Sequence, residues 1–74
     1  MKYATLEEIL NNANKFKICS HCEKICSISE TFCDCGSKSF RRKGVKIAVE
    51  NEIEAVMRIY NYSRKEALET QIDI

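Results

Sequence analysis

Four of the five cysteines in this 74-residue chain fall in two close pairs. Two residues separate Cys19 from Cys22, and one residue separates Cys33 from Cys35. A turn between two nearby cysteines points both sulfur atoms at one spot, and two such pairs supply the four ligands of a tetrahedral zinc site. The spacing therefore predicts one structural zinc ion bound by Cys19, Cys22, Cys33 and Cys35.

The small size of the chain favours such a metal. A domain of this length buries only about 60% of the surface that its unfolded chain exposes, so folds of this size usually need a metal, disulfides or a partner. The N-terminal residues do not form a secretory signal, and no apolar run approaches the roughly 20 residues that cross a bilayer. We therefore expect a cytoplasmic protein without membrane contact, where clustered cysteines bind metal more often than they form disulfides.

The fifth cysteine, Cys26, leaves an alternative open. It lies four residues after Cys22 and could be a buried, inert thiol, because free cysteine behaves as a small hydrophobic residue. It could also replace one of the four ligands or act as a redox-sensitive thiol. The inert thiol is the favoured interpretation, and His21, inside the first pair, is expected to be exposed and not to bind the metal.

The central segment resembles the zinc ribbon family. The string Phe16-Lys17-Ile18-Cys19-Ser20-His21-Cys22 is similar to the first metal-binding turn of that family, and Phe32-Cys33-Asp34-Cys35-Gly36-Ser37-Lys38-Ser39-Phe40 is similar to the second. The second turn departs from the family pattern, because one residue stands between its cysteines where the family has two. The resemblance implies antiparallel strands around one zinc ion and a role in the transcription or translation machinery.

The remaining segments are predicted to be helical, which makes the fold class α+β. A short helix is expected within residues 1–14, a zinc ribbon over 15–46, and two helices within 47–74, all in one domain. Thr5 and Glu8 form one capping-box pair, and Ser63 and Glu66 form another, so each pair marks the start of a helix. The helix that follows Ser63 is expected to continue to about Ile72. The two glycines, at positions 36 and 44, are expected in turns that need a positive φ angle.

Charge is distributed unevenly along the chain. Residues 15–46 carry eight Lys and Arg against three acids, whereas residues 49–74 carry six acids against three basic residues. The basic segment suggests contacts with the phosphates of DNA or RNA, through Lys38, Arg41, Arg42, Lys43 and Lys46. A solubilising charge run is an equally weighted alternative. The three phenylalanines, Phe16, Phe32 and Phe40, are expected to form the core of the ribbon in preference to stacking on bases.

An apolar stripe in the C-terminal segment offers a second functional hypothesis. Its members recur at helical spacing, and they are Val49, Ile53, Val56, Met57 and Tyr60. The stripe could pack inside the monomer or, through Ile53, Val56, Met57 and Tyr60, bind a partner protein. No catalytic set of residues is recognisable. The first hypothesis is thus a non-enzymatic zinc module that contacts nucleic acid or the transcription or translation machinery. The alternative is a protein-interaction adaptor, with the oligomeric state open.

Overall fold

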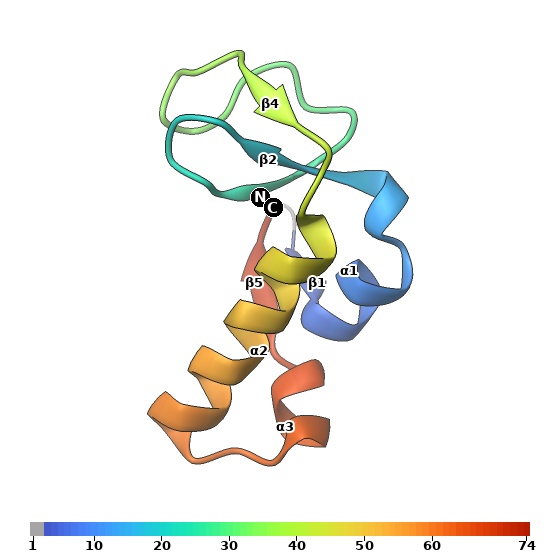
Figure 1. The fold of residues 1–74 in the computed structure, drawn as a ribbon, viewed down its shortest axis with the longest axis vertical. Coiled ribbons are helices and arrows are strands. Elements are labelled where there is room, and N and C mark those ends of the chain that lie inside the picture. Colours follow the sequence, from blue (N-terminus) through green and yellow to red (C-terminus); the bar gives the residue numbers. More distant parts are fainter. Residues whose placement is uncertain (1–2) are drawn as a thin grey trace.

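The computed structural model describes residues 3–74 and combines helices with short antiparallel strands in two sheets, which confirms the α+β class. The molecule is elongated, with principal extents of 35 × 23 × 21 Å, and the three-stranded sheet occupies one end (Figure 1). In chain order the elements are β1 (Tyr3–Thr5), α1 (Leu6–Asn11), the 3₁₀ helix η1 (Ala13–Lys15), β2 (Phe16–Cys19), β3 (Ile25–Ser27), β4 (Phe40–Arg41), α2 (Val45–Tyr60), α3 (Arg64–Leu68) and β5 (Gln71–Asp73).

The three-stranded sheet has the order β3-β2-β4, and all its neighbours are antiparallel. Side chains alternate between its two faces along each strand. Phe16 and Ile18 are buried on the face that packs against the helices, where they join the main hydrophobic core. Cys19 is on the opposite face, which it shares with its cross-strand neighbour Phe40. The sheet therefore separates an apolar core from a cysteine-lined face.

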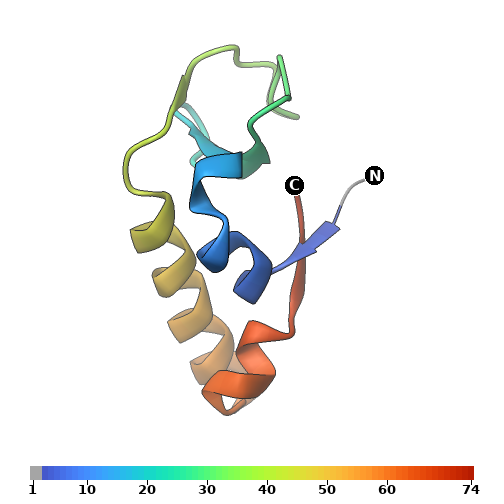
Figure 2. The same cartoon turned by 90° about the vertical axis from the view of Figure 1, so that its right-hand side faces the viewer.

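Helix α2 runs along the long axis of the molecule and supplies much of the core. Val45, Val49, Ile53 and Val56 are all buried, at the helical spacing expected of one packed face. Helices α1 and α3 both lie against α2, and Figure 2 shows α1 between α2 and the strand pair β1–β5. The helix begins after Gly44, whose φ of 85° is left-handed, as the sequence predicted for this glycine.

The two predicted capping residues start helices in the structure. The Thr5 side chain accepts a hydrogen bond from the Glu8 backbone N–H at the start of α1. At the start of α3, Ser63 and Glu66 form a reciprocal capping box. Both short helices therefore begin where their local sequence places them.

The end of the last helix differs from the prediction. Helix α3 ends at Leu68, although the predicted helix continued to about Ile72. The reason is a strand pair, β1–β5, in which Ala4 lies opposite Ile72. These strands satisfy each other's backbone groups, and the Leu6 N–H donates to the Thr70 carbonyl at 3.0 Å. Residues 1 and 2 of the predicted N-terminal segment lie outside the described residues.

The apolar stripe of α2 faces mainly inward. Ile53 is 0% exposed and Val56 is 6% exposed, so the monomer's own core covers these two proposed partner-binding residues. Met57 is half-buried against that core, and Tyr60 is exposed. Packing inside the monomer thus accounts for most of the stripe.

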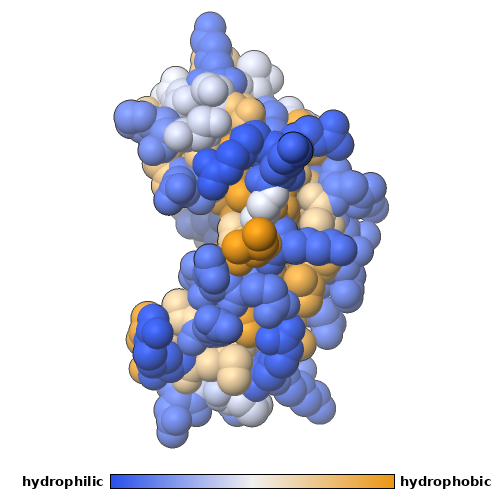
Figure 3. All heavy atoms as spheres, in the orientation of Figure 1, coloured by the Kyte–Doolittle hydropathy of each residue, from blue (hydrophilic) through white to orange (hydrophobic). Residues whose placement is uncertain are grey.

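The surface is mainly hydrophilic in the view of Figure 3, with a small apolar patch over the start of α2. Ile47, in the first turn of this helix, is 69% exposed. Within residues 3–74, no helix has the length and apolar character needed to cross a membrane.

The inward orientation of α2 predicts a contrast between two isoleucines of this helix. Ile53→Ala removes a fully buried side chain and should lower the free energy of unfolding by about 2–5 kcal/mol, through lost burial and a residual cavity. Ile59→Ala, at a position 69% exposed, should change it by less than about 0.5 kcal/mol. Urea unfolding of the metal-loaded variants measures both, and equal effects at the two positions would contradict this packing.

Candidate metal centre

The four paired cysteines come together at one point. The sulfur atoms of Cys19, Cys22, Cys33 and Cys35 all lie within 4.8 Å of one another, with 3.6 Å between Cys19 and Cys35 and 3.3 Å between Cys22 and Cys33. A tetrahedral site with Zn–S bonds of about 2.3 Å needs sulfurs about 3.8 Å apart. This separation lies between the 3.3 Å of the Cys22–Cys33 pair and the 4.8 Å limit for the whole group. All are free thiols. The arrangement can hold one metal ion.

The first cysteine pair is positioned by the turn between β2 and β3. The Cys19 N–H donates to the Lys24 carbonyl, and the Glu23 N–H donates to the Cys19 carbonyl, both at 2.9 Å. Glu23 adopts a left-handed φ of 63°, which reverses the chain into β3. Within this turn the backbone N–H groups of His21 and Cys22 point at Cys19 Sγ, at 3.4 and 3.5 Å. His21 is exposed, as predicted, and is not in the metal-binding group.

The second pair is positioned by a tight turn with a glycine at its end. The Gly36 N–H donates to the Cys33 carbonyl at 2.8 Å, and the Cys33 N–H donates to the Ser37 carbonyl at 2.9 Å. Gly36 has a φ of 89°, which L side chains rarely adopt, although the space around it is open. The positive φ angle, and not a lack of space for a side chain, therefore explains why glycine occupies this position. The turn brings both cysteines to one site although only one residue separates them.

Hydrogen bonds prepare two of the four thiols for ionisation. The backbone N–H of Cys22, aided by that of His21, lowers the pKa of Cys19 to about 6 despite burial. The pKa of Cys33 is also lowered, chiefly by a hydrogen bond from the backbone N–H of Cys35. These groups stabilise the thiolate, which is the form that binds a metal ion.

The other two thiols hold their protons more tightly. The backbone N–H of Lys24 favours the Cys22 thiolate, but the neighbouring Cys33 sulfur and lost hydration outweigh it and raise the pKa of Cys22 to about 12. At Cys35 the Ser37 backbone N–H acts in the same way, yet lost hydration and the Cys19 sulfur raise the pKa. Crowded thiolates repel one another, so only a cation can hold all four ionised together.

Cys26 lies beside this centre but is not one of the clustered ligands. Its side chain is 2% exposed and packs with Cys19, Cys33 and Phe40. The Cys26 Sγ donates to the Lys24 carbonyl at 3.6 Å, and burial raises the pKa of this thiol to about 11. A buried, protonated thiol is a poor nucleophile, which fits the inert interpretation better than the redox one.

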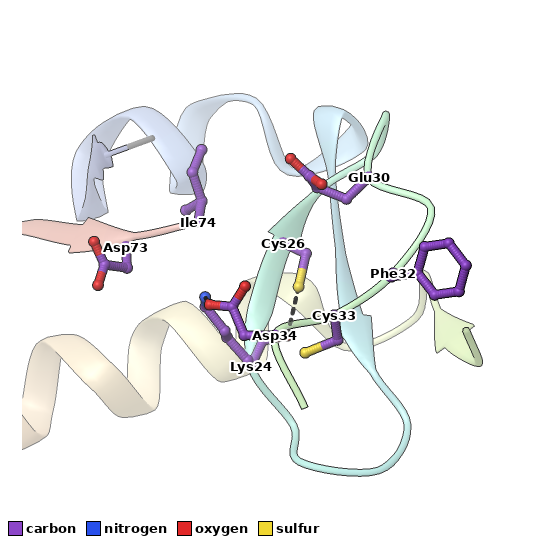
Figure 4. A pocket seen from close by; sticks show the side chains of 8 residues that line it. All are labelled: Lys24, Cys26, Glu30, Phe32, Cys33, Asp34, Asp73 and Ile74. Carbon is purple, nitrogen blue, oxygen red and sulfur yellow. Dashed lines mark hydrogen bonds and ion pairs between the residues drawn. The ribbon is translucent and has the colours of Figure 1, made fainter. Parts of the chain in front are cut away.

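A pocket of about 290 Å³ lies between the metal loops and the C-terminal strand (Figure 4). Cys26 and Cys33 lie in its interior, and Asp73 lines it from β5. Lys24 and Asp34, which also line it, form an ion pair at 2.5 Å that raises the pKa of the lysine and lowers that of the aspartate. This exposed pair closes the metal loop onto β3.

The three phenylalanines do not form one core, which corrects the prediction. Phe16 is buried in the main helical core, and Phe40 packs half-buried beside the cysteines. Phe32 is 53% exposed and lies at the edge of the pocket, apart from the two cysteines in its interior (Figure 4). The sequence offered no signal for this difference, because each phenylalanine lies beside basic or polar residues.

The five basic residues singled out in the sequence, Lys38, Arg41, Arg42, Lys43 and Lys46, are all exposed. Arg41 pairs with Glu23 at 3.6 Å, since both side chains lie at the helix-facing side of the sheet. None of the other four forms an ion pair with a residue in the range 3–74. Arg42 and Lys46 line a shallow hollow beside Phe16, at the start of α2.

Comparison with models of protein families gave no match, and the chain matched neither a curated protein nor a solved structure. The resemblance to zinc ribbons therefore depends on the two cysteine turns and the antiparallel strands that carry them.

Single cysteine substitutions should separate ligands from the neighbouring thiol. Cys19→Ser, Cys22→Ser, Cys33→Ser and Cys35→Ser should each abolish stoichiometric zinc binding, because each removes one of the four clustered sulfurs. Cys26→Ser is the matched control and should keep one zinc per chain, at a cost of about 1 kcal/mol in the free energy of unfolding. Native mass spectrometry gives the stoichiometry. Zinc lost from Cys26→Ser but kept by Cys33→Ser would reverse the assignment.

Metal affinity should fall as pH falls. Cys22 and Cys35, whose pKa values are raised, keep their protons at neutral pH and must release them when a metal binds. Protons and metal thus compete, and zinc affinity should rise with pH throughout the neutral range, and more steeply still below about pH 6, where Cys19 is protonated as well. Competition with a chromophoric chelator at several pH values measures this dependence. A pH-independent affinity would show that the thiols are not the ligands.

Proposed function

We propose that this chain is a non-enzymatic zinc-binding module whose basic residues bind nucleic acid. The zinc-binding part of the proposal is supported by one observation, namely that four free thiols lie within 4.8 Å of one another. Soft thiolate ligands in a tetrahedral arrangement select zinc or an iron–sulfur centre, and zinc is the common occupant of a site formed by two cysteine turns. One structural zinc ion is the cofactor of this proposal.

A site of this kind is structural. Four thiolates fill the coordination sphere of zinc and leave no position for a water molecule or a substrate. Zinc would also fix the loops between β2 and β4, which hold few hydrophobic side chains of their own. Cys19, Cys26 and Cys33 form a small buried cluster there with Phe40 packed against it, whereas Ile25 of β3 belongs to the main core. Metal binding would therefore contribute directly to the folding of this end of the molecule.

The second half of the proposal depends on unpaired positive charge. Lys38, Arg42, Lys43 and Lys46 are exposed and make no ion pair within the described part of the chain. A solubilising role requires only charge, whereas these four residues cluster within nine positions directly after the second cysteine pair. Phosphate groups of DNA or RNA complement such a cluster. Proteins of the transcription or translation machinery are the corresponding candidate partners, in the cytoplasm.

One observation favours a second candidate function. Ile59, Tyr60 and Tyr62 are exposed at the end of α2 farthest from the sheet, and the two tyrosine rings stack with centroids 5.5 Å apart. Exposed aromatic residues are common in protein interfaces. An adaptor would use these residues, because Ile53 and Val56 are covered by the core.

Salt dependence tests the nucleic-acid proposal. Binding of the zinc-loaded chain to a short labelled DNA or RNA should weaken as salt rises, with a log–log slope of roughly −3 for about four phosphate contacts. Arg42→Ala combined with Lys43→Ala should flatten the slope by about 1.5 to 2 units, since two contacts are lost. Fluorescence anisotropy at several salt concentrations gives the slope.

The matched control is Arg58→Ala combined with Lys65→Ala, which removes two exposed basic residues from the acidic half of the chain. This variant should bind like the unaltered protein, and both double variants must keep one zinc per chain. Absence of binding to any DNA or RNA at low salt would remove the proposal and leave the adaptor function.

A further inference from the structure

Phe32 has an unusual position for an aromatic residue in so small a protein. It is 53% exposed, although it directly precedes the metal ligand Cys33. A single exposed hydrophobic side chain is ordinary in itself. Here, however, the next residue is held in the turn by the hydrogen bond from the Cys33 N–H to the Ser37 carbonyl at 2.9 Å, so the turn presents the ring to solvent. What surrounds the ring decides what it can bind.

Cations accompany the aromatic rings on this side of the molecule. Lys38 Nζ lies 5.3 Å from the centroid of Phe32, and Lys17 Nζ lies 3.9 Å from the centroid of Phe40. Lys17 also donates a hydrogen bond to the carbonyl of Glu30, which ties the segment leading to Phe32 onto β2. We name Phe32, Lys38, Phe40 and Lys17 the cation–aromatic patch. Neither lysine forms an ion pair with any carboxylate in residues 3–74.

We infer that the cation–aromatic patch binds single-stranded nucleic acid, with an unpaired base stacked on Phe32 and the adjacent phosphate at Lys38. This inference rests on the proposed function and restricts the nucleic acid that the chain binds to single strands. Proteins that bind single strands combine basic residues that follow the backbone with aromatic rings on which bases stack. Phe32 and Lys38 provide one such combination, and Arg42 and Lys43 continue the positive charge along the chain beyond β4.

Stacking on Phe32 excludes a regular duplex. The faces of paired bases are covered by their neighbours in the helix, so only an unpaired base can lie on an aromatic ring. The charges around Phe32 also orient the strand. Three carboxylates, those of Glu30, Asp34 and Asp73, line the pocket together with one cation, Lys24, which pairs with Asp34. The remaining negative charge disfavours phosphates in the pocket and favours them beside Lys38.

The chain has no tryptophan, so a tryptophan placed at position 32 reports on its surroundings without interference. Phe32→Trp should bind single strands at least as tightly as the unaltered protein, and its fluorescence should be quenched when a base stacks on it. Phe32→Ala should weaken binding to a ten-nucleotide single strand roughly 5- to 160-fold, the range of one lost stacking contact. The probes are labelled dT and rU single strands and a ten-base-pair DNA duplex, all used with the zinc-loaded full chain.

Two controls separate stacking from charge and from a general loss of aromatic surface. Phe32→Ala should leave the salt slope unchanged, whereas Lys38→Ala should flatten it by about 0.7 units because one phosphate contact is lost. Tyr62→Ala removes an exposed aromatic ring from the opposite end of the molecule and should not alter binding. Comparison of the dT and rU strands shows whether DNA or RNA is preferred.

The outcomes distinguish this inference from the function on which it rests. If the unaltered protein binds the duplex as tightly as the single strands, or if Phe32→Ala binds like the unaltered protein, the stacking inference fails while nucleic-acid binding stands. If the unaltered protein binds none of the probes at low salt, both fail. Single-strand preference that is lost in Phe32→Ala and kept in Phe32→Trp, with quenching, establishes the stacked base.

Discussion

Mutual repulsion among four sulfur atoms is the constraint on which the sheet end of this molecule depends. Thiolates within 4.8 Å of one another oppose each other's ionisation, and this opposition, together with lost hydration, raises the pKa values of Cys22 and Cys35. A bound cation reverses the effect, because it attracts all four sulfurs at once. The loops around the site contain little apolar surface to bury, so the attraction of a bound cation would replace the hydrophobic contacts that a larger domain uses.

The two ends of the molecule are thus stabilised by different forces. At one end, the four cysteines, the Lys24–Asp34 pair and short turns hold the loops in place. At the other, buried aliphatic side chains of α1 and α2, such as Ile9, Val49 and Ile53, form a dry core. Strand β2 joins both, because its alternating side chains reach the core from one face and the cysteine cluster from the other. The conformation of the loops that carry the four cysteines therefore depends on the cysteine cluster as well as on the helical core.

Local sequence was sufficient to predict the elements whose determinants are local. The cysteine spacing gave the cluster, Thr5 and Ser63 gave two helix starts, and Gly36 and Gly44 adopt the left-handed turns expected of them. The strand pair β1–β5 could not be foreseen, because residues about 70 positions apart determine it and neither strand has a distinctive pattern. The separation of Phe32 from Phe16 was equally hidden, since exposure depends on which way the metal loop turns.

The same strand pair has a consequence for the order in which the chain folds. The contacts of β2 with β3 join residues at most 11 positions apart, whereas those of β1 with β5 join the two extremes of the described chain. Local pairings close small loops and form early, while distant ones wait until the intervening chain is ordered. We expect the β2–β3 hairpin to assemble first and the β1–β5 pair to form last. We call this pair the clasp, because it joins the two ends of the described chain. The clasp would also be the first region to open in the native protein, because its two three-residue strands hold only a few hydrogen bonds.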